Sequence, residues 1–200
     1  SAATAIRMAG RMTGRKRALI SSDIHPDKKK IIENYCKAAI QIEYIPFDQS
    51  TGQPDTEAFL AALGTDAACI YLESPSYLGV VPADLEHIAA SAHEAGTEVI
   101  IGCEPSLLGV LESPMNLGAD IVTGDIQSLG NHMSYGGGQG GFIASRDELR
   151  YVREYPSRLF GITRTVEEGE YGFGDVYYDR TSFADRENGK EYVGTQAALC

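Results

Sequence analysis

GADIVTGDIQSLGNHMSYGGGQGGFIAS, residues 118–145, joins an apolar run to a polar loop, a glycine-rich turn and a second apolar run. The runs at 119–122 and 141–144 have the composition of strands. Five of the six residues from Gly136 to Gly141 are glycine. A GxGxxG dinucleotide fingerprint opens a helix, whereas these glycines run into a strand. The stretch therefore predicts a tight turn, or packing against a partner, and not a phosphate cradle.

Strand-like and helical segments alternate outward from this stretch. Apolar or alternating runs predict further strands at 17–21, 41–45, 67–72 and 98–102. Helices are expected at 2–12, 27–37, 56–63, 82–95 and 147–154, with a loop or short helix at 105–111. Such alternation is typical of a largely parallel sheet with helices on both faces. The sequence therefore predicts an α/β fold with a mostly parallel sheet flanked by helices.

Composition and charge exclude several classes of protein. The chain is 43% hydrophobic and 22% charged, as is usual for a globular protein. Its net charge of -11 argues against a nucleic-acid or anionic-membrane surface. No stretch approaches the ~20 apolar residues of a membrane span. The four scattered cysteines fit a reducing cytoplasm, and neither cysteine nor histidine spacing predicts a metal site.

Three segments are expected along the chain. They are a core at residues 1–161, an extended arm at 162–195 and the start of a further helix at 196–200. The arm is rich in Gly, Glu, Asp, Arg and Tyr and has little apolar periodicity, so it reads either as an extended arm or as a solvated linker. Both ends of the chain read as helical, and this pattern predicts a fragment of a longer polypeptide.

Ligands in an open α/β sheet lie outside the carboxyl ends of the strands. The loops expected there are 21–26, 73–79, 102–109 and 123–138. They contain no GxSxG elbow, no GxxxxGK[ST] loop and no convincing nucleophile–base pair. Glu73, Glu104 and Asp125 are candidate acids or bases, although a carboxylate at a strand end more often caps a helix or anchors a loop.

Several motifs resemble one known family. They are GADIVxGDxQxLG at 118–130, SYGG at 134–137, GFxA at 141–144, SPSYLG at 74–79, EPSLLG at 104–109 and PSRLFG at 156–161. In this order they resemble the first subunit of the two-subunit glycine dehydrogenase (decarboxylating), the P-protein of the glycine cleavage system. The resemblance implies the large-domain architecture of pyridoxal-phosphate fold-type I, which agrees with the parallel sheet expected from the residues themselves.

The resemblance also implies where a cofactor-binding lysine would lie. In fold-type I proteins it follows a strand such as 119–122, but residues 124–132 contain no lysine. The lysines are Lys16, Lys28, Lys29, Lys30, Lys37 and Lys190, and none is expected at a strand end facing the candidate cleft. We therefore expect no covalently bound pyridoxal phosphate and assign no catalytic residue. A companion subunit is expected to carry the cofactor.

Further partners and site residues follow from the resemblance. Glycine would lose its carboxylate as carbon dioxide, and its aminomethyl group would pass to the lipoyl-carrying H-protein, within a cytoplasmic oligomer. The residues expected to line or support the interface cleft are Tyr77, Glu104, Gln127, Asn131, Ser134, Gly136, Gly137 and Arg158. Arg158 is the candidate for binding an anionic group, because a guanidinium makes bidentate contacts with carboxylates and phosphates.

Two departures from the family leave other functions open. The family's REQHIRREKATSN-like segment is replaced by residues 183–192, where only Arg186-Glu187 aligns, and Glu104 is the acidic residue before Pro105. Both favour a structural or interaction pseudo-enzyme that keeps the fold without catalysis. Among enzymes, the alternative is a subunit of a diverged pyridoxal-dependent lyase or decarboxylase with another amino acid as substrate.

Overall fold

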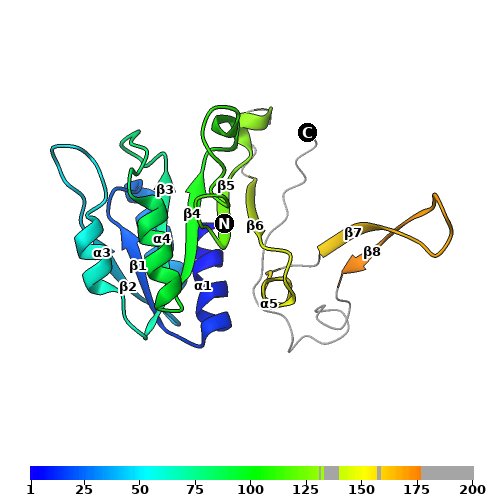
Figure 1. Ribbon diagram of the computed structural model, residues 1–200, viewed down its shortest axis with the longest axis horizontal. Helices are drawn as coiled ribbons and strands as arrows, with labels where there is room; N and C mark the ends of the chain where they lie inside the picture. Colours follow the sequence, from blue (N-terminus) through cyan, green and yellow to red (C-terminus); the bar gives the residue numbers. More distant parts are fainter. Residues whose placement is uncertain (131, 133–139, 157–158, 177–200) are drawn as a thin grey trace. The chain divides into compact units, whose positions relative to one another are not determined.

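The computed structural model describes residues 1–130, 132, 140–156 and 159–176 (Figure 1). By its internal contacts, this part of the chain divides between Arg146 and Asp147 into two units. The first unit contains a large sheet with its helices, and the second contains a short helix and a hairpin. This division lies earlier than the boundary expected at residue 161, and the assignment of functional domains stays a prediction.

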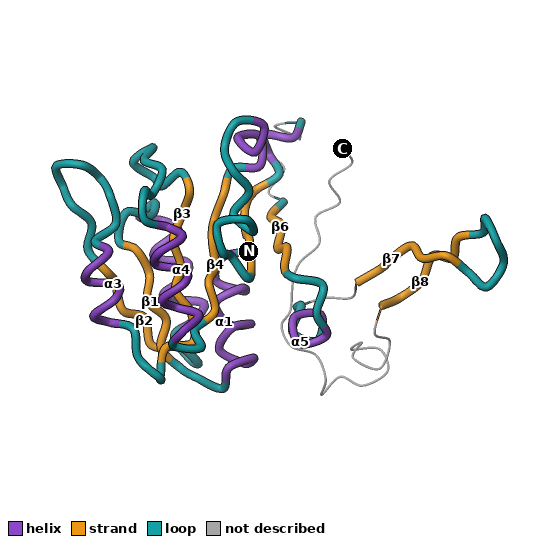
Figure 2. Tube along the Cα trace, viewed as in Figure 1, coloured by secondary structure: helices purple, strands orange, loops and turns teal. Residues whose placement is uncertain are grey.

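The first unit is built on a six-stranded sheet of order β2-β1-β3-β4-β5-β6 (Figure 2). Its parallel strands are β1 (Arg17–Ser21), β2 (Gln41–Ile45), β3 (Ala67–Ser74), β4 (Glu98–Cys103) and β5 (Ile121–Asp125). The edge strand β6 (Gly141–Ser145) pairs antiparallel with β5. The prediction of a mostly parallel sheet is confirmed, and the glycine-rich stretch joins its antiparallel pair.

Helices cover both faces of this sheet (Figure 1). They are α1 (Ala2–Thr13), α2 (Pro26–Cys36), α3 (Thr56–Ala62) and α4 (Leu85–Glu94), with short 3₁₀ helices η1 (Pro105–Gly109) and η2 (Gln127–Leu129). Helices α1 and α2 contact each other, as do α3 and α4. Among the described residues, no helix has both the length and the hydropathy of a membrane span.

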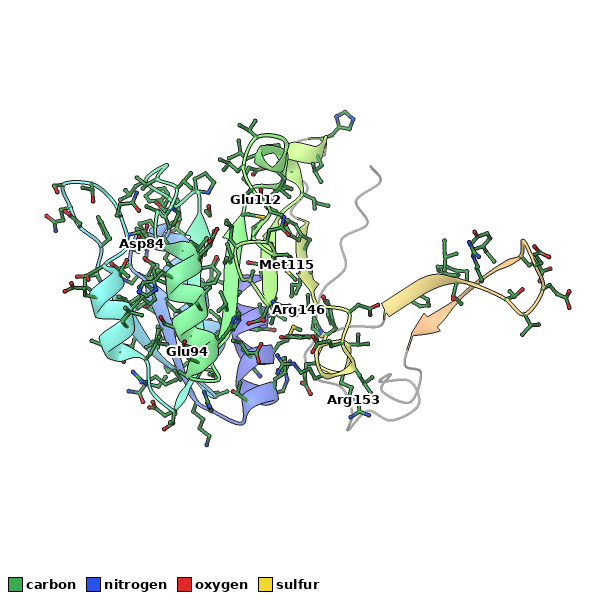
Figure 3. All side chains as sticks on the ribbon, viewed as in Figure 1. Asp84, Glu94, Glu112, Met115, Arg146 and Arg153 are labelled. Carbon is green, nitrogen blue, oxygen red and sulfur yellow. The ribbon has the colours of Figure 1, made fainter. Side chains whose placement is uncertain are left out.

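The amphipathic helix α4 follows from its sequence pattern. Leu85, Ile88, Ala89 and Ala92 recur at helical spacing and are buried in the core. Figure 3 labels Asp84 and Glu94 at the two ends of this helix, where both side chains are exposed. Burial of the apolar stripe against the sheet therefore fixes which face of α4 turns inward.

Strand β3 links the core to the candidate site. All of its residues are buried, and successive side chains of a strand point to opposite faces of the sheet. Ile70 and Leu72 belong to the core cluster that contains α4 residues, whereas Tyr71 and Glu73 line a cavity on the other face. The buried strand thus delivers a hydroxyl and a carboxylate to one place.

Close packing explains two of the glycines in and near the opening stretch. A Cβ on Gly124 would clash with the Cys103 carbonyl oxygen and the Phe142 ring. A Cβ on Gly140 would lie 2.7 Å from Ile126 Cδ1. Glycine therefore permits close contact between neighbouring segments at both positions. Gly136 and Gly137 lie outside the described residues.

The second unit contains α5 (Leu149–Val152) and an antiparallel hairpin of β7 (Leu159–Arg164) and β8 (Tyr171–Val176). The rings of Phe160 and Phe173 stack with centroids 5.7 Å apart. Residues 162–176 of the expected extended arm therefore form most of a hairpin. Residues 177–200 lie outside the described part, so the remainder of the arm and the further helix stay predictions.

Candidate functional site

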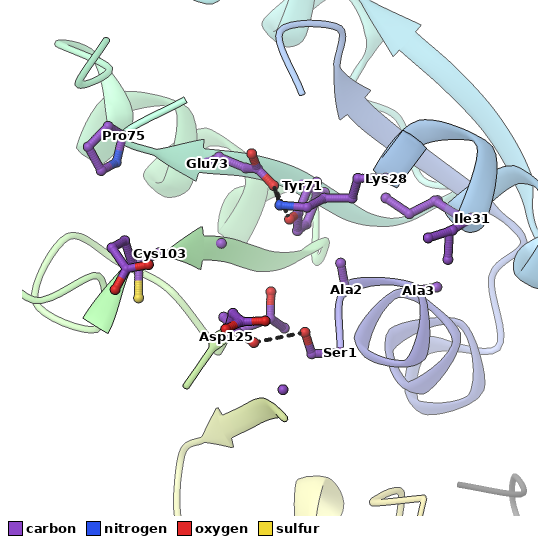
Figure 4. A pocket seen from close by; sticks show the side chains of 16 residues that line it. Ser1, Ala2, Ala3, Lys28, Ile31, Tyr71, Glu73, Pro75, Cys103 and Asp125 are labelled. Atoms are coloured by element: carbon purple, nitrogen blue, oxygen red, sulfur yellow. Dashed lines mark hydrogen bonds and ion pairs between the residues drawn. The ribbon is translucent and has the colours of Figure 1, made fainter. Parts of the chain in front are cut away.

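A cavity of about 630 Å³ opens at the carboxyl ends of β3, β4 and β5 (Figure 4). This is the edge at which ligands bind in open α/β sheets. Its apolar lining comes mainly from the first turn of α1 and from α2. The lining side chains that can carry charge or donate a proton are those of Ser1, Lys28, Tyr71, Glu73, Cys103, Glu104, Thr123 and Asp125.

A half-buried ion pair forms one wall of the cavity. Lys28 Nζ pairs with Glu73 Oε1, and the Glu73 side chain is only 8% exposed. The Tyr71 hydroxyl donates to the same oxygen at 2.7 Å. A buried carboxylate needs such partners, because leaving water costs it several kcal/mol. Burial and the Glu73 charge raise the pKa of Tyr71 well above its usual value, so Tyr71 remains a neutral donor.

Lys28 reaches the cavity because helix α2 begins at this edge of the sheet. Pro26 occupies its first turn, and the His25 ring caps the helix by accepting from the Asp27 N–H at 3.1 Å. The prediction that no lysine lies at a strand end facing the cleft did not anticipate Lys28. That prediction considered only the ends of strands, whereas Lys28 extends its side chain from the first turn of a helix.

Glu104 and Asp125 anchor the loops after β4 and β5. Glu104 Oε1 accepts from the Ser106 N–H at 3.2 Å, the Ser106 hydroxyl at 3.0 Å and the Ser128 hydroxyl. The Ser128 bond, aided by Ser106, lowers the pKa of Glu104. Asp125 Oδ1 accepts from the Gln127 N–H at 2.6 Å. Both carboxylates are thus loop anchors that also line the cavity.

The Cys103 thiol on the remaining wall is not activated as a nucleophile. Burial, with a smaller contribution from Glu104, raises the pKa of the Cys103 thiol, and a protonated thiol is a weak nucleophile. Gly102 leaves room for the Tyr71 hydroxyl, which would lie 2.6 Å from an added Cβ. Among the described residues, no group of three or more His, Cys, Asp or Glu side chains is placed to hold a metal ion.

The structure places three of the eight predicted site residues. Glu104 lines the cavity, whereas Tyr77 and Gln127 lie on nearby loops outside its lining. The Tyr77 ring meets the His25 ring edge-on with centroids 4.8 Å apart, and Gln127 begins η2. The other five, Asn131, Ser134, Gly136, Gly137 and Arg158, lie outside the described residues. Their roles, and the proposed interface, stay predictions.

Tyr71 and Lys28 line the cavity but were not among the predicted site residues. The period-two alternation of β3 could have revealed Tyr71, because it lies two positions before Glu73 and so shares its face of the sheet. No comparable local signal identifies Lys28, whose position depends on how α2 packs.

The described lining fits pyridoxal phosphate poorly. Its one ammonium, on Lys28, is already paired with Glu73, while Glu104 and Asp125 add two further carboxylates. Apart from Lys28, the one part of this lining that favours an anion is the N-terminal turn of α1, at Ala2 and Ala3. A phosphate with two negative charges would therefore meet a net negative surface, and we assign no reaction step to this cofactor on this chain.

Comparison with known sequences identifies close relatives. The sequence pattern of the glycine cleavage system P-protein family matches residues 1–199. Over 154 residues, the chain is 35% identical to probable glycine dehydrogenase (decarboxylating) subunit 1 of Pyrococcus abyssi, covering 76% of this chain and 34% of the relative. The probable glycine dehydrogenase (decarboxylating) subunit 1 of Anaeromyxobacter dehalogenans is 36% identical over 200 residues. This match covers 99% of this chain and 44% of the relative. The chain thus spans less than half the length of these relatives.

Solved structures agree with this result. A crystal structure of inhibitor-bound glycine decarboxylase (P-protein) of the glycine cleavage system matches with a TM-score of 0.85 at 33% identity, covering 99% of this chain and 43% of that one. A sphingosine-1-phosphate lyase from Burkholderia pseudomallei matches with a TM-score of 0.57 at 16% identity, covering 86% of this chain and 40% of that one. At this low identity the match supports the fold alone. The predicted fold-type I architecture is confirmed.

Proposed function

The chain belongs to the glycine cleavage system P-protein family, and from this membership we propose that it forms part of the first subunit of a cytoplasmic glycine dehydrogenase (decarboxylating). In this proposal a companion subunit holds pyridoxal phosphate, which supplies the electron sink for decarboxylation of glycine. The lipoyl-carrying H-protein receives the aminomethyl group. By itself the chain is inactive.

One observation carries the assignment of the cofactor to the companion. Strand β5 ends at Asp125, and residues 124–132 contain no lysine. Of the described lysines, only Lys28 lines the cavity, where Glu73 holds it in an ion pair. Covalent attachment of the cofactor aldehyde requires an amine that is free to react. A lysine on another subunit meets this requirement.

The surface around the cavity supports a role in assembly. Large apolar side chains are exposed on the loops that follow β3, β4 and β5: Tyr77, Leu78, Val81, Leu107, Leu108, Val110 and Leu129. Exposed apolar groups gathered at one edge are typical of protein contacts. We propose that the companion subunit covers these loops, so that this chain shapes and closes the companion's reaction site.

Reconstitution tests this function. The chain and the full-length subunit are each mixed with the companion subunit and lipoylated H-protein, and carbon dioxide release from carboxyl-labelled glycine is measured. We expect no release from the chain alone and release when the full-length subunit meets its companion. Full activity of the companion without any first subunit would favour the pseudo-enzyme alternative. Release from another amino acid, with none from glycine, would favour the diverged lyase or decarboxylase.

A further inference from the structure

Strand β2 leaves one edge of the six-stranded sheet open. Among the described strands it pairs with β1 alone (Figure 2). The Gln41 N–H donates at 2.7 Å to the residue just before β1, and the Ile45 carbonyl accepts at 2.9 Å from the residue just after it. Alternate residues of a strand direct their N–H and C=O groups to opposite sides. The backbone groups of Ile42 and Tyr44 therefore point outward, away from β1.

A groove of about 510 Å³ lies between helix α2 and this edge strand. Its lining consists of Lys30, Glu33, Asn34, Lys37, Ile40 and Ile42. Two contacts of Tyr44 hold the helix beside the strand: its hydroxyl donates to Glu33 at 2.9 Å, and Lys29 Nζ lies 3.8 Å from its ring centroid. Side chains of a strand alternate between the two faces of a sheet. Every second side chain of a strand added at this edge would therefore face the groove.

Two lysines give the groove a positive rim. Lys30 and Lys37 are seven residues apart, almost two helical turns, so they lie on one side of α2 about 10 Å apart. Lys30 makes an exposed ion pair with Asp27 at 3.5 Å, and such pairs are weak. Lys37 is exposed and forms no ion pair within the described part of the chain. Both ammonium groups are therefore available to an incoming anion, whereas the Glu33 carboxylate already accepts from Tyr44.

Charge selects the kind of chain that fits this edge. A second copy paired antiparallel at β2 would bring two lysine rims together on one face of the joined sheet, and like charges would oppose that dimer. A segment with carboxylates on its groove-facing side meets the rim with the opposite charge. The open edge therefore suits an acidic segment better than another copy of this chain.

We propose that the β2 edge binds an extended segment of a partner protein as an added strand, with the pattern acidic-x-apolar-x-acidic. The segment pairs with the outward backbone groups of Ile42 and Tyr44. Its apolar side chain lies over Ile40 and Ile42, and its two carboxylates meet Lys30 and Lys37. Side chains on one face of a strand are about 7 Å apart, so the acidic ones are about 14 Å apart, within reach of the flexible lysines. This surface is separate from the cavity and from the role proposed for the companion subunit.

Hydrogen exchange on the purified chain tests the added strand. The probe is a capped nonapeptide with glutamate at its third and seventh positions, valine at its fifth, and serine or threonine elsewhere. Fluorescence anisotropy of the labelled peptide measures its binding, which we expect to be saturable. The peptide should slow amide exchange at Ile42 and Tyr44 and change it little at Glu43, whose N–H already faces β1. Absence of saturable binding, or protection that spares Ile42 and Tyr44, would overturn the proposal.

Charge variants locate the peptide. Lys30→Met and Lys37→Met should each weaken binding about threefold, and the double variant about tenfold. Lys28→Met is the matched control, because Lys28 lies on the same helix but lines the cavity instead of the groove. Thermal melts verify that each variant folds. Unchanged binding by the folded double variant would overturn the proposal, as would equal binding of a peptide with lysine in place of both glutamates. Neither outcome bears on the reconstitution result.

Discussion

Tyr71 and Glu73 lie two positions apart on β3, and the Tyr71 hydroxyl donates to the Glu73 carboxylate at 2.7 Å inside the protein. The same carboxylate pairs with Lys28. Three residues from one strand and one helix thus form a connected polar group, in which Lys28 and Tyr71 compensate the buried charge of Glu73.

Removal of the Tyr71 hydroxyl tests this dependence. Tyr71→Phe leaves a buried carboxylate with one donor fewer, so we expect the free energy of unfolding to fall by about 1–3 kcal/mol. Tyr44→Phe is the matched control, because its hydroxyl donates at 2.9 Å to Glu33 in an exposed setting. Urea denaturation measures both. Equal losses in the two variants would contradict a special role for the buried bond.

Steric crowding predicts the effect of a methyl group on β5. Gly124→Ala would press its Cβ against the Cys103 carbonyl oxygen and the Phe142 ring, so we expect a loss of about 1–3 kcal/mol in unfolding free energy. Gly109→Ala provides the comparison, because an added Cβ there meets nothing within 4 Å. Thermal denaturation of both variants distinguishes crowding from a general effect of glycine replacement.

The elements that the sequence predicted best are those with strong local patterns. The strands at 17–21 and 41–45 have the observed bounds, because apolar and alternating runs identify strands locally. Strand β5 instead begins at Ile121, two residues later than expected, and extends to Asp125. Just before it, the Asp120 carboxylate accepts from the Val99 N–H at 2.9 Å, and the polar end of β5 pairs with β6. Neither partner is close in sequence.

The candidate site shows the same limit. Glu104 was predictable because it closely follows a strand-like run, and strand ends form the ligand edge of such sheets. Lys28 was not, because its place depends on the packing of α2 and on the reach of a flexible side chain to Glu73. The hairpin of β7 and β8 was missed for a related reason: its exposed Phe160 and Phe173 give no amphipathic pattern of a buried strand.

The cofactor proposal predicts a negative spectroscopic result. Pyridoxal phosphate mixed with the isolated chain should give no stoichiometric lysine adduct, because no lysine follows β5 and Lys28 is paired with Glu73. Absorbance titration and mass spectrometry after borohydride reduction measure the adduct. Lys28→Met should leave the low background unchanged. A one-to-one adduct in the wild type that this variant lacks would show that the chain binds the cofactor itself.

The pKa of Glu104 predicts how stability depends on pH. Its bonds from Ser128 and Ser106 hold this pKa below the usual 4.5. When the folded-state pKa is depressed, the stabilisation is present above the unfolded-state pKa and is lost as pH falls through the folded-state value. The stability advantage of the wild type over Glu104→Gln should therefore shrink as pH drops below 4.5. Urea melts at several pH values measure it, and parallel curves for the two proteins would contradict the assignment.

Limited proteolysis tests how firmly the hairpin is held. Its turn carries Glu167 and Glu168, and the neighbouring Val166 is fully exposed. A two-stranded hairpin is only marginally stable by itself, and a segment with little buried area opens at little cost in free energy. A glutamate-specific protease should therefore cut at 167–170 before it cuts at Glu86 in α4, whose inward face is buried in the core. Addition of the companion subunit should slow the first cut if that subunit covers the hairpin. Early cleavage within α4, with the hairpin intact, would show that the sheet-covering helix is the less stable of the two.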